Sequence, residues 1–195
     1  MRIVLASKSP RRRELLSRLG EKMGFEFEII VSEVDESVED GIYPEEAVRI
    51  LAERKGRAVA ESVGSDSLVI SSDTLVELDG EALGKPIDKA DATRMLTALS
   101  GRGHFVRTGV AVHYKGKVVS GVASTEVVFS PLTSEDIEAY VDSGEPMDKA
   151  GAYGIQGGAG KFVREYRGDF DTVVGLSLRL TEHLIRAALG GDGIE

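Results

Sequence analysis

The sequence predicts a mixed α/β protein with a single two-lobed fold, and three observations support this prediction. Segments with the alternation of strands take turns along the chain with segments that have helical periodicity. Apolar strands are expected at residues 3–6 and 68–70, and two long antiparallel strands at residues 104–114 and 117–129. The chain of 195 residues is long enough for two lobes that share a sheet, and it shows neither an internal repeat nor a clear linker.

The first helix is predicted to begin at a cluster of cations. Ser9 suits the N-cap, Pro10 suits the first helical position, and the helical pattern stops at Gly20. Residues 7–13 read Ser-Lys-Ser-Pro-Arg-Arg-Arg. Backbone donors, the positive end of a helix dipole and guanidinium groups therefore meet in one place, and this combination suits phosphate.

The three arginines of this cluster are expected to differ. On a helical wheel Arg12 falls on the midline of the leucine stripe, Arg11 lies near its flank, and Arg13 points to solvent. An arginine on the buried face requires an anion, which is either a carboxylate of the protein or a ligand.

The remaining elements follow in order from the same patterns. We expect a strand at residues 25–29, an acidic loop at 32–41, a helix at 44–63, a hairpin from residues 75–78 through Asp79-Gly80, a helix at 91–99, a turn at Lys115-Gly116 between the two long strands, a helix capped by Thr133 and ending near residue 141, and a closing helix at 176–189. Residues 190–195 are expected to form a flexible C-terminal tail after one domain over residues 1–189.

Composition excludes several classes of protein. Apolar residues make up 42% of the chain and charged residues 29%, as in ordinary globular proteins. No apolar run is long enough for a membrane span, and no signal peptide pattern is present, so we expect no membrane partner. The absence of cysteine excludes thiolate chemistry and fits a cytoplasmic location. A net charge of −9 argues against nucleic acid as a partner.

Acidic residues suggest metal or base chemistry after the strand at residues 68–70. Asp73 lies just beyond this apolar strand, where an acid can hold a metal or accept a proton from water, or can merely cap a turn. The loop at residues 32–41 holds five acids, most of which are expected to be solvated. One of them near Asp73 would form an oxygen-ligand site of the Mg²⁺ type.

The glycine-rich segment at residues 145–160 is the other candidate for function, because a loop this long inside a compact fold is usually functional. It is not a Walker A motif, since Ile155 stands where a glycine is required and Phe162 replaces the Ser or Thr. Lys55 and Lys85, taken alone, are ordinary surface lysines.

Five motifs stand out in order along the chain: Ser7-x-Ser9-Pro10-Arg11-Arg12, Ser72-Asp73-Thr74, Gly84-Lys85-Pro86, the segment 145–157, and Val173-Val174-Gly175-Leu176. Together they resemble the motifs of the Maf family of nucleoside triphosphate pyrophosphatases. The resemblance covers the chain from Ile3 to about Leu189. It implies an inosine-triphosphatase-like fold of the Maf/HAM1 type, with a twisted mixed sheet, flanking helices and two lobes around a central cleft.

The resemblance also implies roles for single residues. The base or metal ligand falls on Asp73 and a second metal ligand on Glu33; the phosphate-binding residues fall on Ser9, Arg11, Lys55, Lys85 and Lys149; and the residues that mark the dTTP/UTP subgroup fall on Arg12, Thr74 and Gln156. The departures are Ser72 in place of the usual Ala, Ser177 in place of a common Pro, and the additional Arg13.

The implied reaction is hydrolysis of dTTP and UTP to the monophosphate and pyrophosphate, with Mg²⁺, or else Mn²⁺ or Co²⁺, as cofactor. A Gln156 amide can pair with uracil or thymine, but a flipped amide pairs equally with cytosine, so CTP and modified pyrimidine nucleotides stay open. Two alternatives remain: a pyrophosphatase for modified purine nucleotides, and a regulatory protein that inhibits septum formation and cell division. The family also implies a homodimer.

Overall fold

The computed structural model describes residues 1–31, 33–39 and 41–190 and confirms a mixed α/β fold. The elements in chain order are β1 (Arg2–Leu5), α1 (Pro10–Met23), β2 (Glu28–Ile29), α2 (Pro44–Val63), β3 (Ser67–Leu78), β4 (Glu81–Leu83), α3 (Lys89–Leu99), β5 (Gly103–Tyr114), β6 (Lys117–Phe129), α4 (Ser134–Asp142), the 3₁₀ turns η1 (Glu145–Asp148), η2 (Ala150–Ala152) and η3 (Gly158–Phe162), β7 (Val163–Arg167), α5 (Phe170–Val174) and α6 (Leu178–Ala188). Among the described residues no helix is long and apolar enough to cross a membrane.

The sheet has the strand order β2-β1-β3-β5-β6-β7, with β4 paired to β3. The short strand β1 lies parallel to both neighbours, so that Val4 pairs with Glu28 of β2 and with Val69 of β3. Both predicted hairpin turns are present. Asp79-Gly80 has φ angles of 55° and 85°, and Lys115-Gly116 has 48° and 73°. Two successive positive φ angles are those of a type I′ turn, whose twist matches antiparallel strands.

The chain divides into two compact units. The first comprises residues 1–73, 108–123 and 175–195, and the second comprises residues 74–107 and 124–174. The long strands β3, β5 and β6 contribute residues to both units. The single domain over residues 1–189 stays a prediction, and the predicted tail lies, from residue 191 on, outside the described residues.

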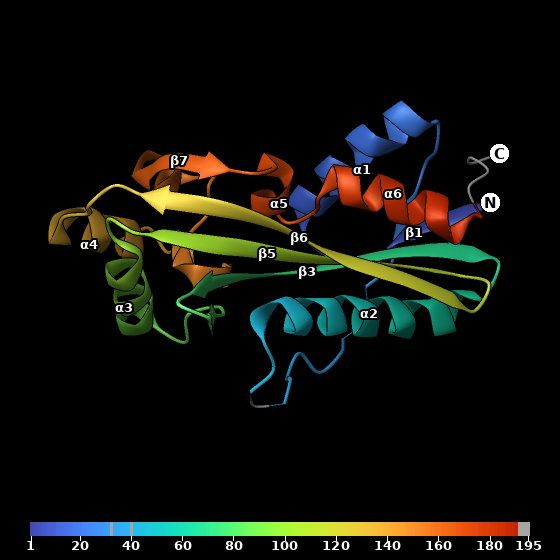
Figure 1. Ribbon diagram of the computed structural model, residues 1–195, viewed down its shortest axis with the longest axis horizontal. Coiled ribbons are helices and arrows are strands. Elements are labelled where there is room, and N and C mark those ends of the chain that lie inside the picture. The colour runs from blue at the N-terminus through green and yellow to red at the C-terminus, as the bar shows by residue number, and fades with distance from the viewer. Residues whose placement is uncertain (32, 40, 191–195) are drawn as a thin grey trace. The chain divides into compact units, whose positions relative to one another are not determined.

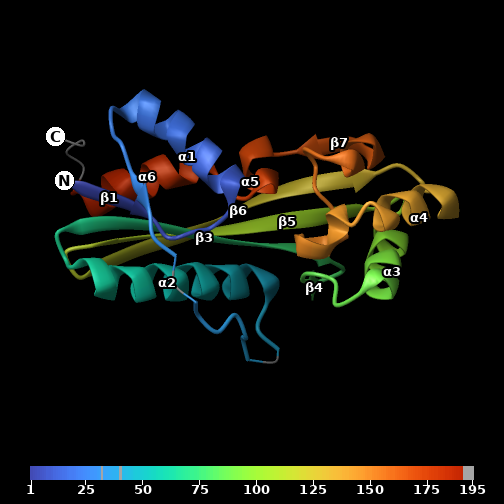
Figure 2. The same ribbon diagram turned by 180° about the vertical axis from the view of Figure 1, so that it is seen from behind.

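In the first unit, helices cover both faces of the sheet. Helices α1 and α6 lie on one face and α2 lies on the other (Figures 1 and 2). Helix α2 approaches the sheet closely at Gly56, where a Cβ atom would come within 2.5 Å of both the His113 ring and the Ser71 hydroxyl. Any side chain at this position would push the helix outward. Gly56 therefore fixes the height at which its neighbour Lys55 stands over the sheet.

In the second unit, the core is built from aromatic rings beneath the glycine-rich segment. Phe129, Tyr153 and Phe162 are buried, and the Phe129 ring packs edge-on against both Tyr153 and Phe162. His104 is also buried, and its Nε2 shares a hydrogen bond of 2.8 Å with the Tyr153 hydroxyl. Edge-to-face contacts of this kind fix ring orientations in addition to burying area. The glycine-rich segment is therefore anchored on a rigid cluster of packed rings.

Several predicted boundaries were wrong for identifiable reasons. Helix α1 continues past Gly20 and ends at Met23, and Gly24, which has φ 76°, is its C-cap. Gly20 is instead a close approach, because a Cβ atom there would lie 2.6 Å from the carbonyl oxygen of Phe25. Strand β2 is shorter than residues 25–29.

The other differences lie nearer the C-terminus and in α3. Helix α6 begins at Leu178 because Ser177 caps it, and α3 begins at Lys89 because Asp88 caps it. Strand β7 and helix α5 were not predicted at all.

Candidate active site

An ion pair between α2 and β3 is the centre of the candidate site in the first unit. Lys55 Nζ lies 2.5 Å from Asp73 Oδ1, and the two side chains are only 15% and 14% exposed. Asp73 was expected just beyond a strand, but β3 runs through it to Leu78. The two serine hydroxyls that precede Asp73 are buried in this strand, and each donates a hydrogen bond to a backbone carbonyl.

The alternation of β3 sorts these polar residues onto two faces. The Ser71 hydroxyl donates to the Ala52 carbonyl of α2 at 2.7 Å, on the face where Asp73 meets Lys55. Ser72 points the other way, and its buried hydroxyl donates to the Gly175 carbonyl at 2.8 Å. The strand geometry thus directs the Asp73 side chain toward α2, where Lys55 binds it.

Arg12 meets the same carbonyl that Ser72 binds. Its Nε donates to the Gly175 oxygen at 2.9 Å, so one carbonyl accepts from both residues. Burial lowers the pKa of the Arg12 guanidinium, and the negative charge of Asp73 opposes this shift. The expectation that Arg12 lies on the buried side of α1 is confirmed by its partial burial, and Asp73 supplies a carboxylate whose field reaches it.

The other residues at the start of α1 are placed as the wheel predicted. Ser9 caps the helix, and its Oγ accepts from the Arg12 backbone N–H at 3.4 Å. Arg11 is partly buried and Arg13 is exposed. The backbone N–H of Ser9 in turn donates to the Ser7 hydroxyl at 3.2 Å, which fixes the entry to the helix.

The acidic loop is tied to α2. Glu36 Oε1 lies 2.8 Å from Lys55 Nζ, so the Lys55 ammonium bridges Glu36 and Asp73. Arg54 reinforces the attachment by donating to the carbonyls of Asp35 at 2.6 Å and Ser37 at 2.7 Å.

Of the predicted acidic ligands, Glu33 lies exposed in this loop, and Glu36 is the acid that reaches Lys55. Sequence reasoning had treated Glu36 as one of several solvated charges, and nothing in the pattern distinguished it from its neighbours. Two residues of the predicted loop, Ser32 and Asp40, lie outside the described residues. Within the described part of the chain, no three His, Cys, Asp or Glu side chains gather as a metal cluster.

The remaining predicted residues belong to the second unit. Thr74 is half-buried on β3, whereas Lys85 and Gln156 are exposed. Lys149 is buried along most of its side chain, and its ammonium donates to the Glu145 carbonyl at 2.8 Å and to Asp148 at 2.7 Å. These are contacts within the glycine-rich segment. Their predicted roles in binding phosphate and base stay predictions.

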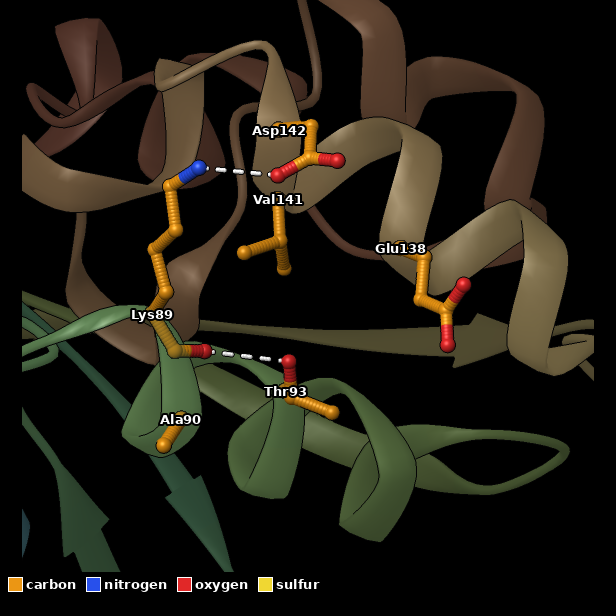
Figure 3. A pocket seen from close by; sticks show the side chains of 6 residues that line it. All are labelled: Lys89, Ala90, Thr93, Glu138, Val141 and Asp142. Carbon is orange, nitrogen blue, oxygen red and sulfur yellow. Dashed lines mark hydrogen bonds and ion pairs between the residues drawn. The ribbon is translucent and has the colours of Figure 1, made fainter.

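A pocket of about 250 Å³ lies between α3 and α4 (Figure 3). It is lined by Lys89, Ala90, Thr93, Glu138, Val141 and Asp142, and an ion pair of 2.8 Å joins Lys89 to Asp142 at its rim. None of these residues was predicted to be functional. Its lining includes none of the candidate site residues described above.

Comparison with known proteins adds to this geometry. The family model described as "Maf-like protein" matches residues 2–188. A relative from Bacillus anthracis named dTTP/UTP pyrophosphatase is 50% identical over 184 residues, covering 94% of both chains. Another from Vibrio cholerae with the same name is 48% identical, covering 94% of this chain and 96% of that one.

The match to the solved structure of the Staphylococcus aureus Ham1 protein covers 98% of this chain and 99% of that chain, at 18% identity and a TM-score of 0.46. The family match and the relatives each span nearly the whole chain. On these grounds the chain belongs to the Maf family.

Proposed function

We propose that this protein hydrolyses dTTP and UTP to the nucleoside monophosphate and pyrophosphate, and so removes these nucleotides or their modified forms from the pool. The observation that carries the proposal is the identity of about half the residues with relatives named dTTP/UTP pyrophosphatase over 94% of the chain. Arg12, Thr74 and Gln156, which mark this subgroup, are all present.

Asp73 is the proposed base. Its carboxylate would accept a proton from the attacking water, the water oxygen would bond to the α-phosphorus, and the bond from the α-phosphorus to the bridging oxygen would break. Pyrophosphate then leaves with the bond's electrons. The ion pair with Lys55 supports this role, because a carboxylate held at 2.5 Å by an ammonium has a fixed direction.

The residues present also fit a divalent cation. Carboxylate oxygens of Asp73 and of the acidic loop are the donor type that Mg²⁺ prefers. The described residues offer no cluster of three acids, and Mg²⁺ is commonly held by one or two carboxylates with phosphate oxygens supplying further ligands. We propose Asp73 with Glu33, as the family implies, and Glu36 is a further candidate because it reaches Lys55. When bound, the ion would spread the negative charge of the phosphates.

Phosphate and base would be bound by different residues. Ser9, Arg11, Lys55, Lys85 and Lys149 are the proposed phosphate contacts. The start of α1 supports this, because the positive end of its helix dipole favours an anion. Gln156 is the proposed reader of the base, accepting from N3–H and donating to O4 of uracil or thymine. Its exposed position in the turn leaves the amide accessible.

We also propose that the protein acts as a homodimer in the cytoplasm, as the family resemblance implies. The lack of cysteine supports a reducing compartment, and the net charge of −9 supports the absence of nucleic acid among its partners. Sedimentation at several concentrations measures the oligomeric state.

The test is pyrophosphate release from dTTP, UTP, CTP and purine triphosphates with Mg²⁺, Mn²⁺ or Co²⁺. We expect dTTP and UTP to be preferred and a chelator to stop the reaction. Asp73→Asn keeps the size of the side chain and removes the base, so turnover should fall by about 10³-fold or more while the circular dichroism spectrum stays unchanged. Near-normal turnover by this variant would exclude Asp73 as the base.

A further inference from the structure

The turn that bears Gln156 is held at both ends by side chains from outside it. The backbone N–H of Gly154 donates to the Tyr140 hydroxyl at 3.1 Å, and the N–H of Gly158 donates to Glu145 Oε2 at 2.9 Å. Between these two points the Gly157 N–H donates to the Gly154 carbonyl at 3.0 Å and closes the turn. The exposed Gln156 lies at the middle of this closed turn.

The two side chains that hold the turn also bind each other. The Tyr140 hydroxyl donates to Glu145 Oε1 at 3.1 Å. Burial raises the pKa of Tyr140, so its hydroxyl keeps the proton that it donates. Every group in this chain of bonds has a partner of the correct kind, since the hydroxyl accepts once and donates once while each carboxylate oxygen accepts once.

Tyr140 and Glu145 are themselves held in place by their neighbours. Tyr140 is 5% exposed, and its ring packs edge-on against Phe162 with centroids 5.4 Å apart. The backbone of Glu145 is fixed in turn, because its carbonyl accepts from the Lys149 ammonium at 2.8 Å. The hydroxyl and the carboxylate thus have defined positions before any ligand binds.

Gly157 shows how closely the turn wraps the carboxylate. A Cβ atom at this position would lie 1.9 Å from Glu145 Oε1, much closer than any real Cβ contact. A side chain at position 157 would therefore have to displace the carboxylate of Glu145 from its bonds to Tyr140 and to the turn. The turn is therefore shaped around the carboxylate and does not merely lie beside it.

We propose that Tyr140 and Glu145 are positioning residues for base recognition: they hold the turn of residues 154–158 so that the Gln156 amide is presented in one orientation. The inference rests on the proposed function, because it takes Gln156 as the reader of a pyrimidine base. Tyr140 and Glu145 bind the backbone of the turn and act on the base only through Gln156. A pre-oriented amide loses less conformational freedom on binding than a mobile one.

The test is a double-mutant cycle of Tyr140→Phe with Gln156→Ala. Tyr140→Phe removes one oxygen and keeps the ring contact, so the fold should persist. We expect it to raise KM for dTTP and UTP by about threefold to tenfold, the effect of one hydrogen bond, with little change in kcat. In the Gln156→Ala background the same change should have no further effect. Inhibition by inorganic tripolyphosphate, which lacks a base, should not change.

Two further measurements separate positioning from a general structural effect. Amide hydrogen exchange at Gly154 and Gly158 should become faster in Tyr140→Phe and in Glu145→Gln, which places an amide N–H₂ against a donor. The matched control is Tyr166→Phe on β7 of the same unit, where the hydroxyl lost belongs to a side chain that is 46% exposed. This control should change neither KM nor amide exchange.

The outcomes are distinct. If the wild-type protein releases no pyrophosphate from pyrimidine triphosphates, the proposed function fails before any variant is made, and the inference falls with it. If the wild type is active but Tyr140→Phe lowers activity equally with and without Gln156, or leaves exchange at Gly154 and Gly158 unchanged, the proposed function stands and the positioning role is excluded. Non-additive effects of the two substitutions on KM, together with faster amide exchange at Gly154 and Gly158, support the positioning role.

Discussion

The two units hold their candidate functional residues by different means. In the first unit, Asp73 and Lys55 stand on a long strand and a long helix, and they are aimed by the pleat of β3 and by the height of α2 above it. In the second unit, Gln156 stands on an irregular turn whose backbone is tied to Tyr140 and Glu145. The residues proposed for charge chemistry therefore lie on regular elements, whereas the residue proposed for base recognition lies on a loop.

This difference has a physical reason. Proton transfer and phosphate binding require fixed distances, which helices and strands supply through their repetitive hydrogen bonds. Recognition of a nucleotide base requires a shape that regular elements do not offer. An irregular turn provides that shape but lacks repetitive backbone hydrogen bonds, and here side-chain hydrogen bonds hold the turn in place. The first arrangement should therefore be sensitive to loss of charge, and the second to loss of single hydrogen bonds.

After the loss of the Asp73 carboxylate itself, the largest effect is expected when the cation that pairs with it in the first unit is removed. Lys55→Met keeps the length of the side chain but leaves Asp73 and Glu36 without their shared ammonium. Because the pair is mostly buried, we expect a loss of about 3 kcal/mol of transition-state stabilisation, or about 100-fold in kcat/KM for dTTP. Steady-state pyrophosphate release measures this loss.

The matched control is Lys22→Met, the same substitution in an ion pair of the same unit. Lys22 lies 2.6 Å from Glu182, but its side chain is 66% exposed, and surface pairs of this kind contribute little. Activity should be unchanged. Equal effects of the two substitutions would show that the Lys55–Asp73 pair has no special role.

The same contrast explains what could be predicted from sequence. The start of α1 was predictable because Ser9, Pro10 and the leucine stripe are local signals, and both type I′ turns were predictable from Asp79-Gly80 and Lys115-Gly116. Asp73 could be singled out from its place after an apolar strand, whereas Lys55 was marked only by the family resemblance. Their contact spans 18 positions, and no local pattern predicts it.

The second unit was less accessible to sequence reasoning. The sequence predicts a functional role for the glycine-rich segment, and this stays a prediction. The shape of the segment could not be predicted, because it depends on Tyr140, a helical residue that precedes it and has the pattern of an ordinary core position. Strand β7 and helix α5 were not predicted because each is only five residues long and has no clear hydrophobic periodicity. Such short elements form through contacts with residues that are distant in the sequence.

A second prediction concerns His104 in the buried aromatic core of the second unit. Burial lowers the pKa of His104 to about 4, below the unfolded value of 6.5. Above pH 6.5 both states are neutral. As the pH falls from 6.5 to 4, the unfolded chain binds a proton that the folded chain does not, so stability is lost over this window, by about 3 kcal/mol in all.

Chemical denaturation of the wild type and of His104→Gln at several pH values measures this contribution. The glutamine can still accept from Tyr153 but does not titrate, so the difference in unfolding free energy between the two proteins should change as the pH falls below 6.5. The contributions of the other titrating groups to the unfolding free energy are the same in both proteins and cancel in the difference. Parallel curves would show that His104 is not a source of acid sensitivity in the second unit.

The smallest effect should come from Ser72, which departs from the usual alanine of the family. Ser72→Ala removes one of the two donors on the Gly175 carbonyl and leaves the other, from Arg12, in place. Since the acceptor stays partnered, we expect a loss of about 1 kcal/mol of unfolding free energy. Arg12 would be held less firmly, so the ratio of kcat/KM for dTTP over CTP should fall.

Ser71→Ala is the matched variant for this test. Ser71 is equally buried on the same strand, but its hydroxyl donates to the Ala52 carbonyl on the opposite face. Both variants should lose similar stability, whereas only Ser72→Ala should alter the dTTP to CTP ratio. If the ratio moves in both or in neither, the Gly175 carbonyl does not orient Arg12, and selectivity in the first unit depends on the guanidinium charge alone.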